Sequence, residues 1–210
     1  MERSQIDRIA RETLLNERSH KEREIGWAYR HGQRTAALAL WLRELLFPER
    51  AEWDDALYAA AQLHDCAKTS KTDHGVAGAA RAGKLLRGIV EPEALPVIQS
   101  AIQKHNKRGL PSTEMEQLLQ DADIVDHFGS IEVWLNVSYS VLSGSGPEMS
   151  LEFYRTEMDK MVEELLPQFN FEPARRVFLE RVQFSRQFAD RLAVEAAGGV
   201  YLAQDVLRNI

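Results

Sequence analysis

Apolar residues recur at helical rather than alternating spacing in nearly every segment of this 210-residue chain. Side chains three, four and seven positions apart share one face of an α-helix, whereas a half-buried strand alternates with a period of two. We find no convincing strand pattern, internal repeat or low-complexity tract. The sequence therefore predicts an all-α fold, and its hydrophobic content of 44% is enough for one full core.

The predicted helices end at recognisable breaks in this pattern. Pro48 stops the second helix, a polar loop at 68–73 separates the third from the fourth, and residues 143–147 are the clearest linker. The expected helices cover residues 4–17, 25–47, 52–66, 74–87, 92–105, 112–128, 151–169 and 173–197, with a short last helix after Gly198-Gly199. We predict one globular unit, in which residues 1–142 form the working domain and residues 143–210 a C-terminal helical extension that packs on it.

Charge and cysteine content restrict the classes of function. The formal net charge of -6 disfavours a general nucleic-acid-coating role, although it allows a small anionic substrate. Cys66 is the single cysteine, so an intrachain disulfide framework is ruled out. No stretch approaches the roughly 18 apolar residues of a membrane span, and the N-terminus has no apolar signal region. We expect a cytoplasmic protein without membrane contact, whose long C-terminal helices are compatible with a homodimer but do not require one.

The dipeptide His64-Asp65 closes an apolar helical run at residues 56–63. Two ionisable side chains are costly to bury at such a place unless a partner compensates them. Histidine and aspartate are both common metal ligands. We therefore expect a divalent metal ion as their partner.

Three further predicted helices each direct a metal-capable side chain towards the interior. His31 continues one apolar stripe, His105 ends another, and Asp123 shares a face with Leu119. A lone inward histidine is most often a hydrogen-bonded core residue, and a lone inward aspartate is commonly a cap or a partner of arginine. Taken together with His64-Asp65, however, they are hard to bury without a cation. The mixed His and Asp set favours manganese, iron, cobalt, nickel or zinc over calcium.

In their order along the chain, these residues resemble the H…HD…D signature of the HD-domain superfamily of metal-dependent phosphohydrolases. The matching positions are His31, His64-Asp65 and Asp123. The segment that ends at Lys68 is similar to the family's L-H-D-x-x-K box, and Asp121-Ala122-Asp123 to its D-A-D box. The resemblance covers about residues 25–140 and implies an HD-domain helical bundle, followed here by a C-terminal helical annex.

Two more histidines bear on the number of metal ions. His74 begins a segment similar to the family's H-x-x-x-G-A, and His105 ends one similar to its I-x-x-H. In two-metal members, such as diadenosine-tetraphosphate hydrolases and cyclic-dinucleotide phosphodiesterases, histidines at these places hold the second ion while the aspartate corresponding to Asp65 bridges. The resemblance thus implies one or two divalent transition-metal ions per chain. This sequence departs from that pattern in two ways: the interval from Asp65 to His74 is short, and no His-His pair occurs at 105. If the second metal site is empty, we expect His74 and His105 to bind substrate phosphate instead.

The resemblance implies a phosphohydrolase that cleaves a phosphate ester or anhydride of a nucleotide or related small phosphate with metal-activated water. The expected metal ligands are His31, His64, Asp65 and Asp123. The expected catalytic residues are Asp65 and Lys68. The expected substrate-binding residues are Arg34, Lys68 and Lys104. Arg34 either binds phosphate or locks a ligand carboxylate, and Lys104 belongs to a basic stretch with Lys107 and Arg108 that is either an anion-collecting rim or a solvated loop.

Two other classes of function share these residues. Some HD proteins hold a di-iron site with the same ligands and act as oxygenases, and a non-catalytic metal- or nucleotide-binding module could keep the fold without turnover. The module would be marked by a missing ligand, and the four principal ligands are all present here. Asp121, Asp126 and His127 flank Asp123, and we expect them to cap or support rather than to bind metal.

Overall fold

The computed structural model describes residues 2–20, 23–68 and 73–202. Over these ranges the chain forms ten α-helices and two short 3-10 helices without a strand, which confirms the predicted all-α class. The predicted loop at 68–73 lies largely outside the described residues, as does most of the segment expected to form a last helix. The helices are α1 (Arg3–Leu14), α2 (Trp27–Leu46), η1 (Ala51–Trp53), α3 (Asp54–Leu63), α4 (His74–Leu85), α5 (Ala94–Lys104), α6 (Glu114–Asp126), α7 (Ser130–Leu142), α8 (Pro147–Thr156), α9 (Met158–Leu165), η2 (Leu166–Gln168) and α10 (Glu172–Ala196).

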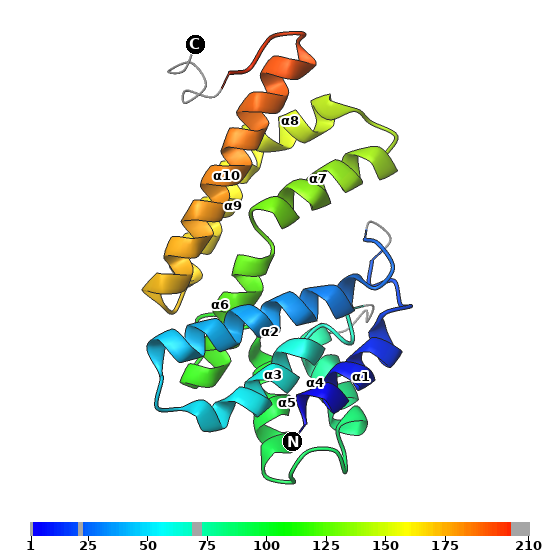
Figure 1. Cartoon of the computed structure of the whole chain (residues 1–210), viewed down its shortest axis with the longest axis vertical. Helices are drawn as coiled ribbons and strands as arrows, with labels where there is room; N and C mark the ends of the chain where they lie inside the picture. Colours follow the sequence, from blue (N-terminus) through cyan, green and yellow to red (C-terminus); the bar gives the residue numbers. More distant parts are fainter. Residues whose placement is uncertain (1, 21–22, 69–72, 203–210) are drawn as a thin grey trace.

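The helices form two groups along the long axis of the molecule (Figure 1). In the lower group α2 packs on α3 and α6, α4 packs on α5, and α5 packs on α3 and α6. In the upper group α8 contacts α7 and α9, and α10 runs alongside. Because α10 also packs on α6, it connects the C-terminal helices to the bundle. The boundary that we predict at residue 142 stays a prediction.

Small residues allow α2 and α3 to approach closely. A Cβ atom added to Gly32 on α2 would lie 2.5 Å from the backbone oxygen of Gln62 on α3. Ala36 and Ala39 on α2, like Ala60 on α3, are completely buried. Since Gly32 follows His31 and Gln62 precedes His64 by two positions, this contact brings the two histidines together.

Local hydrogen bonds define where the site-bearing helices begin. Thr113 and Glu116 form a capping box at the start of α6, in which the Glu116 carboxylate accepts from Thr113 N at 2.7 Å. The Asp73 carboxylate accepts from Gly75 N at 3.0 Å at the start of α4. These caps fix the first turns of the helices that carry Asp123 and His74.

The C-terminal half differs from the expected helix pattern in two places. Residues 151–169, predicted as one helix, form two, because the backbone departs from helical geometry at Glu157 (φ −114°) and α9 turns Met158 and Val162 inwards. The predicted linker at 143–147 is shorter than expected, because Pro147 begins α8 as its first residue. A further helix, α7, lies at residues 130–142, where no helix was predicted.

Hydrogen bonds and one aromatic cluster join α10 to α6. The Asp121 carboxylate accepts from the backbone N–H groups of Asn170 and Phe171, at 3.0 and 2.9 Å, just before α10 begins. Phe178 on α10 is completely buried, with its ring 4.5 Å from that of Phe128. In the described parts of the chain, every helix is too short or too polar to traverse a lipid bilayer.

Candidate metal centre

The close contact of α2 with α3 places His31 beside His64 in the interior. Both imidazoles are completely buried, and their Nε2 atoms lie 3.0 Å apart. Two nitrogen lone pairs at this distance repel each other unless a proton or a cation lies between them. Asp123, on α6, adds Oδ1 at 3.2 Å from His31 Nε2 and at 3.6 Å from His64 Nε2.

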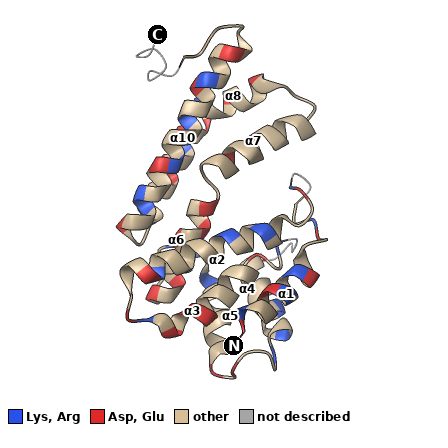
Figure 2. Ribbon diagram, in the orientation of Figure 1, with Lys and Arg blue, Asp and Glu red and all other residues tan. Residues whose placement is uncertain are grey.

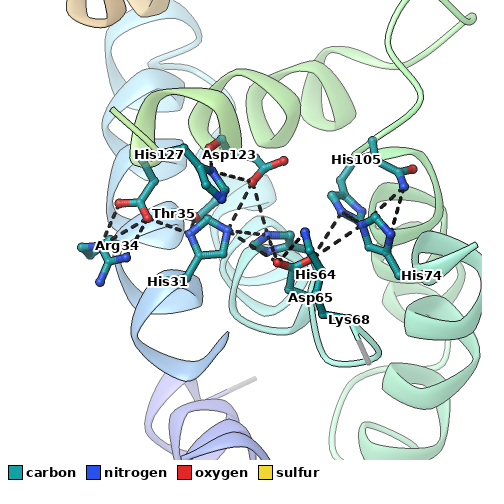
Figure 3. Close-up of polar contacts among 12 residues, drawn as sticks. His31, Arg34, Thr35, His64, Asp65, Lys68, His74, His105, Asp123 and His127 are labelled. Carbon is teal, nitrogen blue, oxygen red and sulfur yellow. Dashed lines mark hydrogen bonds and ion pairs between the residues drawn. The ribbon is translucent and has the colours of Figure 1, made fainter. Parts of the chain in front are cut away.

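Asp65 lies between this trio and the two remaining histidines (Figure 3). Its Oδ2 atom is 3.9 Å from the Nε2 atoms of both His31 and His64. Its Oδ1 atom is 3.7 Å from the Nε2 atoms of both His74 and His105. The carboxylate therefore has one oxygen facing each pair of histidines, which is the arrangement of a bridging ligand.

His74 and His105 form the second half of the site. Their Nε2 atoms are 3.2 Å apart, and the side-chain amide of Asn106 lies 3.3 Å from His74 Nε2. The structure thus brings together all six residues that the sequence singled out as metal ligands. Asn106, which directly follows His105, was missed because nothing in its spacing distinguishes it from a loop residue.

Hydrogen bonds to the opposite ring nitrogens turn the Nε2 atoms inwards. His64 Nδ1 donates to the Ala61 carbonyl at 2.7 Å, and His105 Nδ1 donates to the Ile102 carbonyl at 2.6 Å. A carbonyl can only accept, so each Nδ1 carries the hydrogen and each neutral ring keeps its Nε2 lone pair for the centre. Burial favours this neutral form, since it lowers the pKa of His64.

His31 is oriented by Asp126 in the same way. The Nδ1 atom of His31 lies 2.6 Å from Asp126 Oδ2, and the Arg34 guanidinium binds the same carboxylate through Nε at 2.8 Å and Nη2 at 2.9 Å. Burial alone would lower the pKa of His31, but the bonds to Asp123 and Asp126 raise it to about 9. Asp126 thus joins His31 to Arg34, and the role of His31 as a metal ligand stays a prediction.

The two lysines predicted to bind phosphate have different partners. Lys68 Nζ lies 3.1 Å from Asp65 Oδ1, and its side chain is 38% exposed, so it stands at the open side of the centre. Lys104 Nζ instead pairs with Glu116 at 3.0 Å, and no hydrogen bond or ion pair of the described residues joins its ammonium group to the six predicted metal ligands. Arg108, from the same basic stretch, binds Asp123 Oδ2 at 3.2 Å.

The donor set fits a divalent metal ion. Nitrogen–metal bonds of about 2.0–2.1 Å at angles of about 90–109° place two ligand nitrogens about 2.8–3.4 Å apart, which matches both histidine pairs. Asp65 is 4% exposed, and the Lys68 ammonium pairs with its carboxylate, with Nζ 3.0 Å from Oδ2 and 3.1 Å from Oδ1. Burial opposes ionisation of this carboxyl group, yet the neighbouring histidines and Lys68 hold its pKa well below the usual range. A buried, ionised carboxylate that faces two pairs of histidine nitrogens is a natural ligand for a cation.

Within the described part of the chain, four overlapping groups of side chains have ligand atoms within 4.8 Å of one another. Asp65 belongs to two of them, one with His31 and His64 and the other with His74 and His105. One group also includes His127 with His31 and Asp123, although we expected His127 only to support. His127 Nδ1 donates to the Asp123 carbonyl at 2.9 Å, and the same atom lies 3.6 Å from Asp123 Oδ1.

The model of the HD domain family matches residues 28–127, which span His31, His64-Asp65, His74, His105 and Asp123. Residues 28–127 form an HD domain. HD domains generally bind a divalent metal ion, in agreement with the two groups of ligands that share Asp65.

Solved structures share this HD-domain fold over most of the chain. A Bacillus thuringiensis HD-superfamily hydrolase is 20% identical, with a TM-score of 0.66, covering 93% of this chain and 96% of its own. A predicted HD-superfamily hydrolase from an uncultured Thermotogales bacterium is 21% identical, with a TM-score of 0.62, covering 91% of each chain. Bacillus subtilis YpgQ in complex with ADP is 20% identical, with a TM-score of 0.61, covering 89% of this chain and 95% of its own. No curated protein matches the sequence.

A substitution of Asp126 tests how strongly metal binding depends on the residue that orients His31. We expect Asp126→Asn to weaken metal binding by about 10- to 100-fold, because the amide no longer supplies the charge that orients His31. Competition with a chromophoric chelator measures the affinity, and circular dichroism checks the fold. Asp159→Asn, the same change at a 72% exposed side chain, should leave the affinity unchanged. Equal affinities for the two variants would contradict a positioning role for Asp126.

Proposed function

We propose that this HD domain is a metal-dependent phosphohydrolase that cleaves a phosphate ester or anhydride of a nucleotide or related small phosphate with metal-activated water. The observation that carries the proposal is the buried Asp65 carboxylate, whose oxygens face two different histidine pairs. In the proposed site His31, His64, Asp65 and Asp123 hold the principal ion. His74 and His105 hold a second ion together with Asp65.

A divalent ion in such a site supplies a bound water with a pKa of about 7 and neutralises charge on phosphoryl oxygens. The chain's own contribution is to orient the ligands. The Nδ1–H donations of His64 and His105 to backbone carbonyls select the tautomer in which Nε2 of the neutral ring faces the centre. Lys68 stands beside Asp65 with a partly exposed ammonium group, and we assign it the binding of a phosphate oxygen.

Two considerations narrow the cofactor and the substrate. Imidazole nitrogens mixed with carboxylate oxygens favour manganese, iron, cobalt, nickel or zinc over a purely oxygen-ligated ion. The similarity to YpgQ, which was solved with ADP, supports a nucleotide as the phosphorylated substrate, at 20% identity.

Metal removal tests the proposed reaction directly. Protein stripped with a chelator should release no phosphate or pyrophosphate from nucleoside di- and triphosphates, and addition of manganese, nickel or cobalt should restore release, because the site's water is activated only by a bound ion. Elemental analysis of the untreated protein should find close to one or two transition-metal ions per chain. Protein with no bound metal and no gain of activity on adding these ions would overturn the proposal. If iron-loaded protein takes up oxygen and releases no phosphate, the function is that of a di-iron oxygenase instead.

A further inference from the structure

A cavity of about 510 Å³ lies between α2, the turn from α6 to α7, and α10. None of the six predicted metal ligands, all of them described residues, lines it. Asp126 does line it, at 2.6 Å from His31 Nδ1, whereas His31 Nε2 faces the proposed metal centre. The cavity therefore lies on the opposite side of that imidazole. Its volume is within the usual range of about 300–1,000 Å³ for small-molecule sites.

Arg181 on α10 brings a guanidinium group into the wall of this cavity. Its Nη1 atom donates to the Val125 carbonyl at 2.7 Å, and its aliphatic stem lies against Gly129, where an added Cβ atom would be 3.1 Å from Arg181 Cγ. Its Nε and Nη2 atoms have no hydrogen-bond partner among the described residues. Burial lowers the pKa of Arg181, and Asp126 and Glu180 oppose this only in part, while Arg34 adds to it. The guanidinium is thus partly desolvated, held in place, and without a carboxylate that binds it.

Arg34 brings a second guanidinium group into the same wall from α2. Its Nε and Nη2 atoms bind the Asp126 carboxylate at 2.8 and 2.9 Å, and its Nη1 atom has no hydrogen-bond partner in the described part of the chain. The guanidinium carbon also lies 5.1 Å from the centroid of the Trp27 ring. The side chain is 31% exposed, so Arg34 is fixed on one side and open to a ligand on the other.

The charges in the wall come from α2, α6 and α10, because α7 is almost free of charged residues (Figure 2). Asp126 and Glu180 are the acidic residues that line the cavity. The Asp126 carboxylate is 1% exposed and is already paired with Arg34. Glu180 is exposed, and in the described ranges it forms no ion pair with either arginine. Two guanidinium groups therefore face one cavity without enough carboxylates to bind both, which favours an anion.

The rest of the wall is mainly apolar. It is formed by Ala37, Leu38, Phe128, Ile131 and Phe184. Phe184 is 43% exposed, so an aromatic ring stands at the open side of the cavity. An apolar surface beside two cations suits a molecule that has a phosphate group at one end and an apolar or aromatic group at the other.

We propose that the cavity between α2 and α10 binds a small phosphorylated organic molecule, with its phosphate group between Arg34 and Arg181 and its organic part against the apolar wall. Guanidinium N–H groups form charge-assisted hydrogen bonds with phosphate oxygens. Arg34, expected either to bind phosphate or to lock a carboxylate, does both here, at a site apart from the metal centre. The inference does not rest on the proposed hydrolysis, because no predicted metal ligand lines the cavity.

Calorimetric titration of the untreated protein with phenylphosphonate tests the site, because this anion carries an aromatic ring and its carbon–phosphorus bond resists hydrolysis. Arg181→Gln should weaken binding at least about tenfold, since it removes a charge-assisted hydrogen bond. Glu180→Gln should strengthen binding, because it removes a carboxylate from the same wall. Arg176→Gln, at an exposed residue of α10 outside the lining, should leave the affinity unchanged. Inorganic phosphate should bind more weakly than phenylphosphonate, because it leaves the apolar wall uncovered.

Two further variants separate this cavity from the metal centre. Ser130→Glu places a carboxylate in the lining at the exposed first residue of α7, where an acidic side chain is favourable for the helix, and it should abolish binding. Lys68→Gln changes the metal centre and should leave this binding event unchanged.

Several results would overturn the inference. Unchanged affinity in Arg181→Gln together with a loss in Lys68→Gln would place the phosphonate at the metal centre instead. Equal weakening by Glu180→Gln and Arg181→Gln would show that the charge of the wall does not determine binding. If Arg181→Gln does not fold, unchanged binding in Ser130→Glu would overturn the inference. Equal affinities for phosphate and phenylphosphonate would overturn the assignment of an organic ligand.

Discussion

Replacing Asp65 with asparagine is expected to reduce hydrolysis by about a thousandfold or more, because the charge stabilisation from a bound metal is worth several kcal/mol. The amide keeps the size of the side chain but removes the negative charge that two histidine pairs share. We also expect the metal content to fall in parallel, to one ion or none per chain. Phosphate release and elemental analysis on the same preparations measure both effects.

The control for this change is Asp159→Asn, since Asp159 is an exposed residue of α9 whose pair with Arg186 lies on the surface. That variant should keep full activity and metal content. Loss of activity in Asp65→Asn with a full complement of metal would assign Asp65 to the reaction rather than to metal binding. Full activity with full metal content would contradict the bridging role altogether.

Replacing Phe178 with alanine is expected to lower the free energy of unfolding by about 3–5 kcal/mol, the usual cost of removing a buried aromatic ring. The Phe178 ring lies 4.5 Å from that of Phe128 and 4.9 Å from that of Phe169. It therefore fills the contact between α10 and the end of α6. Urea unfolding followed by circular dichroism measures the loss.

Phe184→Ala makes the same change on the same helix at a residue that is 43% exposed. It should cost less than about 1 kcal/mol, because little apolar surface leaves the protein interior. Equal losses in the two variants would show that Phe178 does not stabilise the contact of α10 with α6.

The sequence was most informative where a polar side chain interrupts an apolar stripe. His31, His64 and His105 could be assigned to the interior because helical periodicity gives the direction of a side chain without any knowledge of its neighbours. Which residues support them could not be predicted in this way. Asp126 and His31 are 95 positions apart, and their hydrogen bond depends on how α2 crosses α6.

The region of α7 shows why part of the fold was missed. Residues 130–142 are apolar almost all round, so they give no clear face. The turn that precedes them uses Gly129 with a positive φ of 76°, which glycine adopts without strain. Consequently α7, and the buried Glu132 that it carries, became visible only in the structure.

The contact between Gly32 and Gln62 has a consequence for ion size. Backbone packing, rather than flexible side chains alone, keeps the His31 and His64 nitrogens 3.0 Å apart. A Cβ atom at position 32 would meet the Gln62 carbonyl and hold the two helices, and with them the two imidazoles, further apart. One hydrogen atom in place of a methyl group thus allows both nitrogens to approach a single small ion.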